Sequence, residues 1–164
     1  MKIIDNFLTD EEFKPIAETF LGEEFPWFYN DAISERGDDR FQFIHGLYKD
    51  CTFVSNFAPL MFPILNKLNM FMLKRIKANL ITRTERQLKS IPHIDYKNIK
   101  TAIFDVNTNN GYTQFDNKTV PSVANRIVIF DSNLKHSSVS QTNTKQRVVI
   151  NFNYVTQEDN ENKR

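Results

Sequence analysis

The sequence predicts a single domain that is mainly β, with helices flanking the strands. Its 164 residues suit one hydrophobic core and are too few for two. From Ile76 onward, short runs rich in β-branched and aromatic residues alternate with clusters of Asn, Asp, Ser and Thr, a pattern typical of a sandwich or barrel. The runs fit a double-stranded β-helix, the jelly-roll or cupin-like fold, and cover residues 76–84, 91–96, 101–106, 112–115, 126–130, 137–141 and 147–154.

Composition and charge narrow the classes of function. Hydrophobic residues make up 40% and charged residues 25% of the chain, as in folded soluble domains. The net charge of +1 argues against binding of nucleic acid by bulk electrostatics. The single cysteine, Cys51, excludes a disulfide framework and a Cys-rich zinc site, and we expect it to be buried. No apolar run suits a signal peptide or a membrane span, so we expect a cytoplasmic location and no membrane partner.

The one domain, residues 1–164, is expected to have two parts and a tail. Residues 1–75 should supply supporting helices and strands, and residues 76–156 should form the double-stranded β-helix core. The last residues, 157–164, are polar and are expected to be frayed.

The first thirty residues carry clear start and stop signals. A strand is predicted over residues 2–7, followed by a helix, because Thr9 and Glu12 have the spacing of a capping box. Gly22 follows the apolar face of this helix and is a plausible end point. Residues 25–30 are aromatic and predict a second strand.

The next segment mixes loop, strand and helix signals. Residues 31–40 are polar and aperiodic, so we expect residues 30–40 to form an unburied loop that closes over an active site as a lid. Residues 41–45 have strand character. Residues 56–75 are apolar near helical spacing, which predicts a helix whose start is delayed by Pro59 and Pro63.

Two histidines and a carboxylate suggest a metal site. His93 and Asp95 are two residues apart in a predicted strand, so both side chains would project from the same face. His136 follows a later strand that topology could bring alongside. Two His and one carboxylate form the facial triad of non-haem Fe(II) oxygenases, which leaves three positions open for co-substrate and O2.

An H-x-D pattern alone is weak, because this composition gives one by chance about one time in five. Arg147 strengthens the pattern, because it opens the last strong β-run after His136. From there its guanidinium could hold a carboxylate through two parallel hydrogen bonds at the far end of a pocket. We therefore interpret these residues as a metal triad at one end of a pocket and an anion-binding arginine at the other end.

Together these features resemble the 2-oxoglutarate and Fe(II)-dependent oxygenases, in particular the prolyl-4-hydroxylase-like branch and its compact phage-encoded members. The resemblance covers about residues 76–154. It is carried by four features: His93-Ile94-Asp95, the G-x-T-x-F-like run Gly111-Tyr112-Thr113-Gln114-Phe115, the run Asn125-Arg126-Ile127-Val128-Ile129-Phe130 before His136, and Arg147. Residues 3–8 resemble the family's opening strand more weakly.

The resemblance implies roles for the site residues. His93, Asp95 and His136 would bind Fe(II), and Arg147 would pair with the distal carboxylate of 2-oxoglutarate. Thr82 and Thr84 match positions that can line the co-substrate pocket in the wider superfamily, and Asn151 shares a strand face with Arg147. Ordinary polar strand residues are the alternative interpretation of these last three.

One position departs from the family pattern. Asp105 occupies a strand position where prolyl hydroxylases often place a tyrosine that helps to hold 2-oxoglutarate. An acidic side chain beside Arg147 would compete with the co-substrate for the guanidinium, so either Asp105 faces away or the binding mode differs.

The implied activity is an Fe(II) and 2-oxoglutarate-dependent dioxygenase that hydroxylates an unactivated C–H bond, uses O2, releases succinate and CO2, and takes ascorbate in a supporting role. The alternative from another class is a catalytically silent jelly-roll protein that binds metal or another partner. A peptide or small-molecule substrate is favoured over nucleic acid, with peptidyl proline favoured by resemblance only, and the oligomeric state is open. His45 has no carboxylate at metal spacing, so we interpret it as a core or pocket-rim residue.

Overall fold

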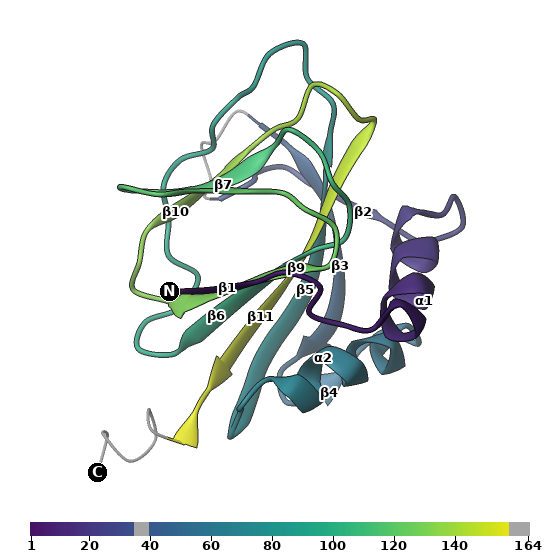
Figure 1. The fold of residues 1–164 in the computed structure, drawn as a ribbon, viewed down its shortest axis with the longest axis vertical. Coiled ribbons are helices and arrows are strands. Elements are labelled where there is room, and N and C mark those ends of the chain that lie inside the picture. Colours follow the sequence, from purple (N-terminus) through teal and green to yellow (C-terminus); the bar gives the residue numbers. More distant parts are fainter. Residues whose placement is uncertain (35–39, 158–164) are drawn as a thin grey trace.

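The computed structural model describes residues 1–34 and 40–157, and its strands form two antiparallel sheets (Figure 1). The larger sheet has the strand order β1 (Lys2–Ile4), β9 (Arg126–Asp131), β6 (Lys100–Asp105), β11 (Gln146–Val155), β5 (Met72–Thr82), β3 (Gln42–Lys49) and β2 (Phe28–Asn30), and β4 (Thr52–Phe53) pairs with β3. The smaller sheet has the order β10 (His136–Val139), β7 (Tyr112–Phe115) and β8 (Thr119–Pro121). The predicted mainly β jelly roll is confirmed.

Strand β11 divides the molecule into a hydrophobic layer and a polar cavity. Its residues alternate between the two faces of the sheet, and all but Gln146 are buried. Val148, Ile150 and Phe152 join the main hydrophobic core beneath the helices. Arg147 and Asn151 point to the opposite face, toward the small sheet, where they line a cavity.

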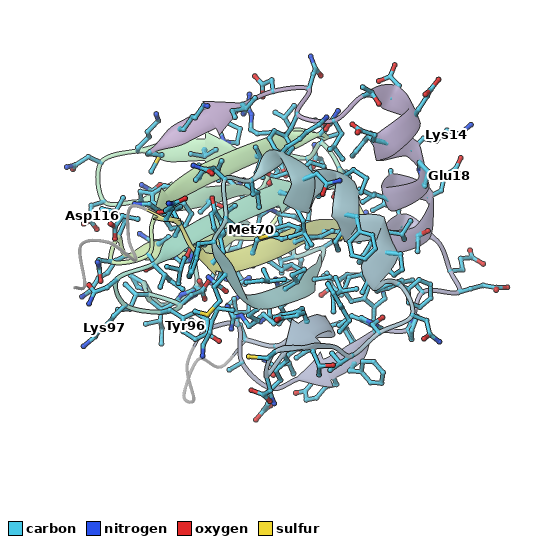
Figure 2. All side chains as sticks on the ribbon, turned by 90° about the horizontal axis from the view of Figure 1, so that it is seen from below. Lys14, Glu18, Met70, Tyr96, Lys97 and Asp116 are labelled. Carbon is cyan, nitrogen blue, oxygen red and sulfur yellow. The ribbon has the colours of Figure 1, made fainter. Side chains whose placement is uncertain are left out.

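The main core lies between the large sheet and the helices α1 (Asp10–Leu21), η1 (Ala58–Met61) and α2 (Phe62–Lys67). The predicted capping box of α1 is present, because the Thr9 hydroxyl accepts from the Glu12 amide and the Glu12 carboxylate accepts from the Thr9 amide. Phe20 is fully buried against the sheet. Lys14 and Glu18 lie one turn apart on the solvent side of α1 (Figure 2). The helix therefore supports the sheet from outside, away from the cavity.

A smaller hydrophobic cluster joins the two sheets at one end of the cavity. Phe115 of the small sheet packs on Phe130 of the large sheet with ring centroids 4.9 Å apart. The other members are Ile103, Val120, Val128 and Val149. This cluster fixes the distance between the sheets beside the candidate site.

The helix expected over residues 56–75 is shorter than predicted. The chain forms η1 and α2 and then leaves the helix at Leu68, and β5 already begins at Met72. Phe71 donates a backbone hydrogen bond to Val155, which ties the start of β5 to the end of β11. The apolar spacing that favoured a longer helix comes in part from Phe71 and Met72, whose side chains are exposed.

The strand expected over residues 91–96 is also wrong. Only an isolated bridge between His93 and His136 occurs there, and Pro92 has no N–H to extend a ladder. His136 begins β10 instead of preceding it. The first strand stops at Ile4, short of the predicted residue 7, because the chain turns at Asn6, which has a φ of 48°.

The first 75 residues also contribute to the large sheet. Strands β1, β2, β3 and β4 all belong to it, and β3 pairs directly with β5. Cys51, expected to be buried, is exposed in the turn between β3 and β4 with a φ of 60°. Residues 158–164 of the expected tail and residues 35–39 of the expected lid lie outside the described residues. Within the described ranges, no helix has the length and apolarity to cross a membrane.

Candidate active site

The cavity lies between the inner face of the large sheet and the small sheet. Its empty volume, with the open mouth included, is about 450 Å³. The sequence-predicted residues His93, Asp95, His136, Arg147 and Asn151 all line it. The structure therefore brings together five residues that the sequence distributes over nearly sixty positions.

His93, Asp95 and His136 converge at one end of this cavity. The backbone bridge sets the two histidines side by side, with each amide nitrogen 3.0 Å from the other residue's carbonyl oxygen. One ligand atom from each of the three residues lies within 4.8 Å of the other two. The imidazole rings of the two histidines have centroids 4.6 Å apart. Two imidazoles and one carboxylate thus face a common point.

Both imidazoles are oriented by backbone carbonyls. Nδ1 of His93 lies 3.2 Å from the Ile91 oxygen, and Nδ1 of His136 lies 3.4 Å from the Leu134 oxygen. A proton donated from Nδ1 leaves Nε2 free to ligate a metal. Burial lowers the pKa of His136, which favours the neutral form that a metal requires.

Asp95 is held by two partners outside the triad. The Arg75 guanidinium lies 3.1 Å from one carboxylate oxygen, and the Asn153 amide donates to the other at 3.2 Å. Burial alone would raise the pKa of Asp95, but the Arg75 charge and the Asn153 hydrogen bond lower it to about 2. Asp95 is therefore ionised across the whole physiological range.

The donor set fits an Fe(II) ion. Neutral imidazoles and an ionised carboxylate are the ligands of the facial triad, and the open side of the cluster faces the cavity. Each ligand has a second partner that fixes its orientation: a backbone carbonyl for each histidine, and Asn153 with Arg75 for Asp95. Such outer contacts are typical of metal sites in proteins.

Arg147 lies at the other end of the cavity and is 1% exposed. Its Nε donates to Ser122 at 2.6 Å, Nη1 donates to Ser138 at 2.8 Å, and Nη2 donates to Thr113 at 3.2 Å. All three acceptors are neutral hydroxyls, so they orient the guanidinium without neutralising it. Ser138 lies two residues after His136 on β10, which connects the two ends of the cavity.

Gly111 explains the start of the G-x-T-x-F-like motif. A Cβ atom at this position would lie 2.8 Å from Cδ of Arg147 and 2.9 Å from the Val139 carbonyl oxygen. A side chain at residue 111 would therefore displace the arginine. The hydroxyl oxygen of Thr113, the threonine of the same motif, accepts a hydrogen bond from Nη2 of Arg147.

Asp105 faces Arg147, as the sequence departure suggested. One carboxylate oxygen lies 3.8 Å from Nη2 of Arg147, too far for a hydrogen bond, and no described residue hydrogen-bonds to this oxygen. Burial raises the pKa of Asp105 to about 6, although the Arg147 charge opposes this effect. The two groups are neighbours without forming a close ion pair.

Thr82 and Thr84 are not brought to the cavity. They line a separate pocket together with Arg40 and Leu88, and the Thr84 hydroxyl contacts Ser140 at 2.6 Å. Both lie near the end of β5, beyond Ile81, the position that pairs with Arg147. Asn151 does line the cavity, and its Oδ1 is buried without a described partner.

Several cavity residues were missed by the sequence analysis. The sequence analysis singled out neither Lys77, which lines the cavity from β5, nor Arg75, which contacts Asp95 from the same strand. Burial and the nearby Arg75 charge lower the pKa of Lys77 to about 8. The available signal was the alternation of polar residues with Ile76, Ala78 and Leu80, which predicts two different faces of one strand.

Two further sequence expectations concern the rim. His45 is a core residue, since its ring nitrogens contact the Pro26 carbonyl and the Ser55 hydroxyl, each at 2.7 Å. Ile33, in the segment expected to be an unburied loop, is 8% exposed and lines the cavity. At least this end of the loop is therefore packed against the site.

Comparison of the whole fold finds the oxygenases that the motifs resemble. A 2OG-Fe(II) oxygenase family oxidoreductase from Burkholderia pseudomallei matches with a TM-score of 0.63 at 9% identity, covering 93% of this chain and 84% of that protein. A prolyl hydroxylase from Trichoplax adhaerens, in complex with a hypoxia inducible factor peptide fragment, matches with a TM-score of 0.62 at 15% identity, covering 99% and 86%.

The same fold occurs with other chemistry. A predicted oxalate decarboxylase from Thermotoga maritima matches with a TM-score of 0.51 at 15% identity, covering 80% of this chain and 94% of that protein. No family model matches the sequence, and no curated protein matches it. The structural neighbours therefore establish the fold alone, and any indication of activity comes from the cavity residues.

Proposed function

We propose that this protein is a non-haem Fe(II) and 2-oxoglutarate-dependent dioxygenase that hydroxylates an unactivated C–H bond. One observation carries the proposal: a facial-triad donor set and a buried arginine lie at opposite ends of the same cavity. The balanced reaction takes 2-oxoglutarate, O2 and the substrate, and yields succinate, CO2 and the hydroxylated product. One oxygen atom enters succinate and the other enters the product.

The residues divide the work between the two ends. His93, Asp95 and His136 hold Fe(II), which when bound supplies the activation of O2 that drives oxidative decarboxylation. Arg147 holds the distal carboxylate of 2-oxoglutarate, with Ser138 and Thr113 keeping its guanidinium in place. A guanidinium with spare N–H groups suits a carboxylate better than an ammonium does.

The surrounding residues orient the ligands and limit the entry of water. Asn153 and Arg75 fix the Asp95 carboxylate in one position. Ile81, Ile103 and Val149 give the cavity wall an apolar surface between the polar groups. Such a wall strengthens electrostatic contacts and protects reactive species from side reactions.

For the substrate we propose only a chemical class. A peptide or a small molecule, with peptidyl proline as the first candidate, is supported by the prolyl hydroxylase among the structural neighbours, which was crystallised with a peptide. We keep nucleic acid as a less favoured substrate. Four further proposals come from the sequence resemblance. The protein would belong to the prolyl-4-hydroxylase-like branch and resemble its compact phage-encoded members. It would act in the cytoplasm of a host cell, and ascorbate would support its activity.

A silent binding protein is the second candidate, and a specific observation favours it. Asp95 already has an ion pair with Arg75, and Arg147 already faces Asp105. If these internal pairs outcompete the ligands, the cavity would bind neither Fe(II) nor 2-oxoglutarate productively. The jelly roll would then serve as a structural or binding module.

Anaerobic titration separates the two candidates. Purified protein is titrated first with Fe(II) and then with 2-oxoglutarate, and the visible spectrum is recorded. We expect one equivalent of Fe(II) and a weak charge-transfer band that appears only when both are present. Absence of the band together with absence of calorimetric binding of 2-oxoglutarate would move the assignment to the silent jelly roll.

A further inference from the structure

The cavity contains a second cation that the proposed roles do not use. Lys77 lines the cavity from β5, on the same strand face as Arg75 and Asn79. Within residues 1–34 and 40–157, its ammonium group forms no ion pair and donates no hydrogen bond. A partly buried cation without a partner is costly and points to a missing anion.

Asn151 lies directly across the β5–β11 ladder from Lys77. The residue is 9% exposed and lines the cavity, and its Oδ1 atom has no described hydrogen-bond partner. The other cavity amides differ, because Gln42 donates to the Ile33 carbonyl and Asn79 donates to the Lys77 carbonyl. Lys77 and Asn151 are thus two adjacent polar groups, both directed into the cavity and both unsatisfied.

Charge places this pair at the metal end of the cavity. The charges that act on Lys77 are those of Arg75 and Asp95, whereas the charges that act on Asp105 are those of Arg147 and Arg126. The ladder agrees, because Lys77 pairs with Asn151 next to the rung of Arg75 and Asn153, while Ile81 pairs with Arg147. Lys77 and Arg147 therefore lie toward opposite ends of the cavity, at ladder positions about 13 Å of strand apart.

We propose that Lys77 and Asn151 form a subsite for the oxo-acid end of a 2-oxo acid, contacting its carboxylate beside the metal while Arg147 holds the opposite carboxylate. This inference rests on the proposed function and extends it to two residues. Lys77 has three protons, so it can donate to the ligand carboxylate and to Oδ1 of Asn151 together. The amide nitrogen of Asn151 supplies a further donor.

Three probe ligands distinguish the two ends. 2-Oxoglutarate has both carboxylates and the keto group, 2-oxopentanoate lacks the distal carboxylate, and glutarate lacks the keto group. Each is titrated calorimetrically into Mn(II)-loaded protein, so the measurement is independent of turnover. The variants are Lys77→Met, which keeps chain length without charge, Lys77→Arg, which restores charge, and Lys74→Met, an exposed control on the same strand.

We expect Lys77→Met to lower the affinity for 2-oxoglutarate and for 2-oxopentanoate by the same factor, about ten- to a hundredfold, because each ligand loses one charge-assisted contact. Glutarate keeps a carboxylate at the same end, so its binding should be weakened as well; Lys77→Arg should recover most of the lost affinity, and Lys74→Met should match wild type. Thermal unfolding verifies the fold of each variant, and Lys77→Gln replaces Lys77→Met if the latter does not fold.

Three results would overturn the inference. The first is unchanged affinity of Lys77→Met for both oxo acids. The second is a loss confined to 2-oxoglutarate and glutarate, which would assign Lys77 to the distal carboxylate. The third is wild-type protein that binds 2-oxoglutarate but not 2-oxopentanoate, because the oxo-acid end would then have no anchor of its own. Failure of the proposed function gives a different result, namely no binding of 2-oxoglutarate by wild type.

Discussion

The two ends of the cavity each contain a buried carboxylate beside an arginine, yet their electrostatics are opposite. At the metal end, Arg75 lies 3.1 Å from Asp95, whose pKa falls to about 2. At the far end, Arg147 lies 3.8 Å from Asp105, whose pKa rises to about 6 because of burial. Similar pairs of residue types therefore produce carboxylates with very different acidity.

Arginine charge and hydrogen bonding together account for the difference, and the charge of the closer arginine has the larger influence on Asp95. Asp95 accepts from Asn153 and contacts Arg75 closely, so its charged form is compensated. One oxygen of Asp105 has no described partner, and Arg147 directs its bonds to Ser122, Ser138 and Thr113 instead. Burial of a charge is tolerated only where its lone pairs are satisfied. We infer that the metal end is built around a permanent anion and the far end around a permanent cation.

The largest expected effect is loss of the metal. His93→Ala, Asp95→Ala and His136→Ala should each abolish binding of Fe(II) while leaving the fold intact, because the main core lies on the other side of the sheet. Asp95→Glu should also fail, since one added methylene exceeds the roughly 0.2 Å tolerance of metal–ligand distances. Metal content after dialysis and circular dichroism measure the two outcomes.

Asp116→Ala, at an exposed aspartate that does not line the cavity, is the matched control and should bind one equivalent of Fe(II) (Figure 2). Stoichiometric Fe(II) in any two of the three alanine variants would contradict the triad assignment.

The second effect concerns the cation at the far end. Arg147→Ala should lower the affinity for 2-oxoglutarate by roughly two to four decades, because removing one partner of a buried charge pair costs about 3–5 kcal/mol. Binding of Mn(II) alone should be unchanged, since the triad lies at the other end. Arg147→Lys should be intermediate, because an ammonium cannot form two parallel hydrogen bonds with a carboxylate. Calorimetric titration of Mn(II)-loaded protein measures all three.

Arg83→Ala, at an exposed arginine, provides the control for loss of a positive charge. If Arg147→Ala kept the wild-type affinity for 2-oxoglutarate, another residue would hold the distal carboxylate. The far end of the cavity would then not be built around the Arg147 cation.

The sequence predicted which residues share the cavity better than it predicted their secondary structure. His93, Asp95, His136 and Arg147 were identified from residue type and order, and all four line one cavity. The strand expected around His93 is absent because a single bridge suffices to align the two histidines. Local propensity cannot reveal such a bridge, since its partner is 43 residues away.

The missed residues have a common physical cause. Arg75 and Lys77 are charged, and charged side chains are usually solvated, so composition alone assigns them to the surface. Their burial depends on β5 lying between β3 and β11, which is a tertiary property. The prediction for Thr82 and Thr84 failed in the opposite direction. They were expected to line the cavity, but they lie beyond its end and line a separate pocket.

A smaller effect is expected from the contact that orients Asp95. Asn153→Ala removes one hydrogen bond to the carboxylate and also the acceptor of Nε of Arg75, and should weaken binding of Mn(II) about ten- to a hundredfold, as is usual for outer contacts of metal ligands. Asn66→Ala, on the exposed side of α2, is the control. Equal metal affinity in the two variants would show that Arg75 alone positions Asp95.

The smallest expected effect tests the uncompensated carboxylate, through Asp105→Asn. Because the pKa of Asp105 is about 6 in the folded protein and 3.8 when unperturbed, the folded state binds the extra proton between these values, and the free energy of unfolding falls as the pH rises through this window. Between pH 4 and pH 7, the free energy of unfolding of wild type should therefore fall by up to about 3 kcal/mol relative to that of Asp105→Asn. Urea unfolding of metal-free protein measures this change. At pH 7.5 the same variant should bind 2-oxoglutarate about tenfold more tightly, since a neutral amide no longer competes for Arg147. A parallel pH dependence of the two unfolding free energies would mean that Asp105 is as well compensated as Asp95, and the contrast between the two ends would disappear.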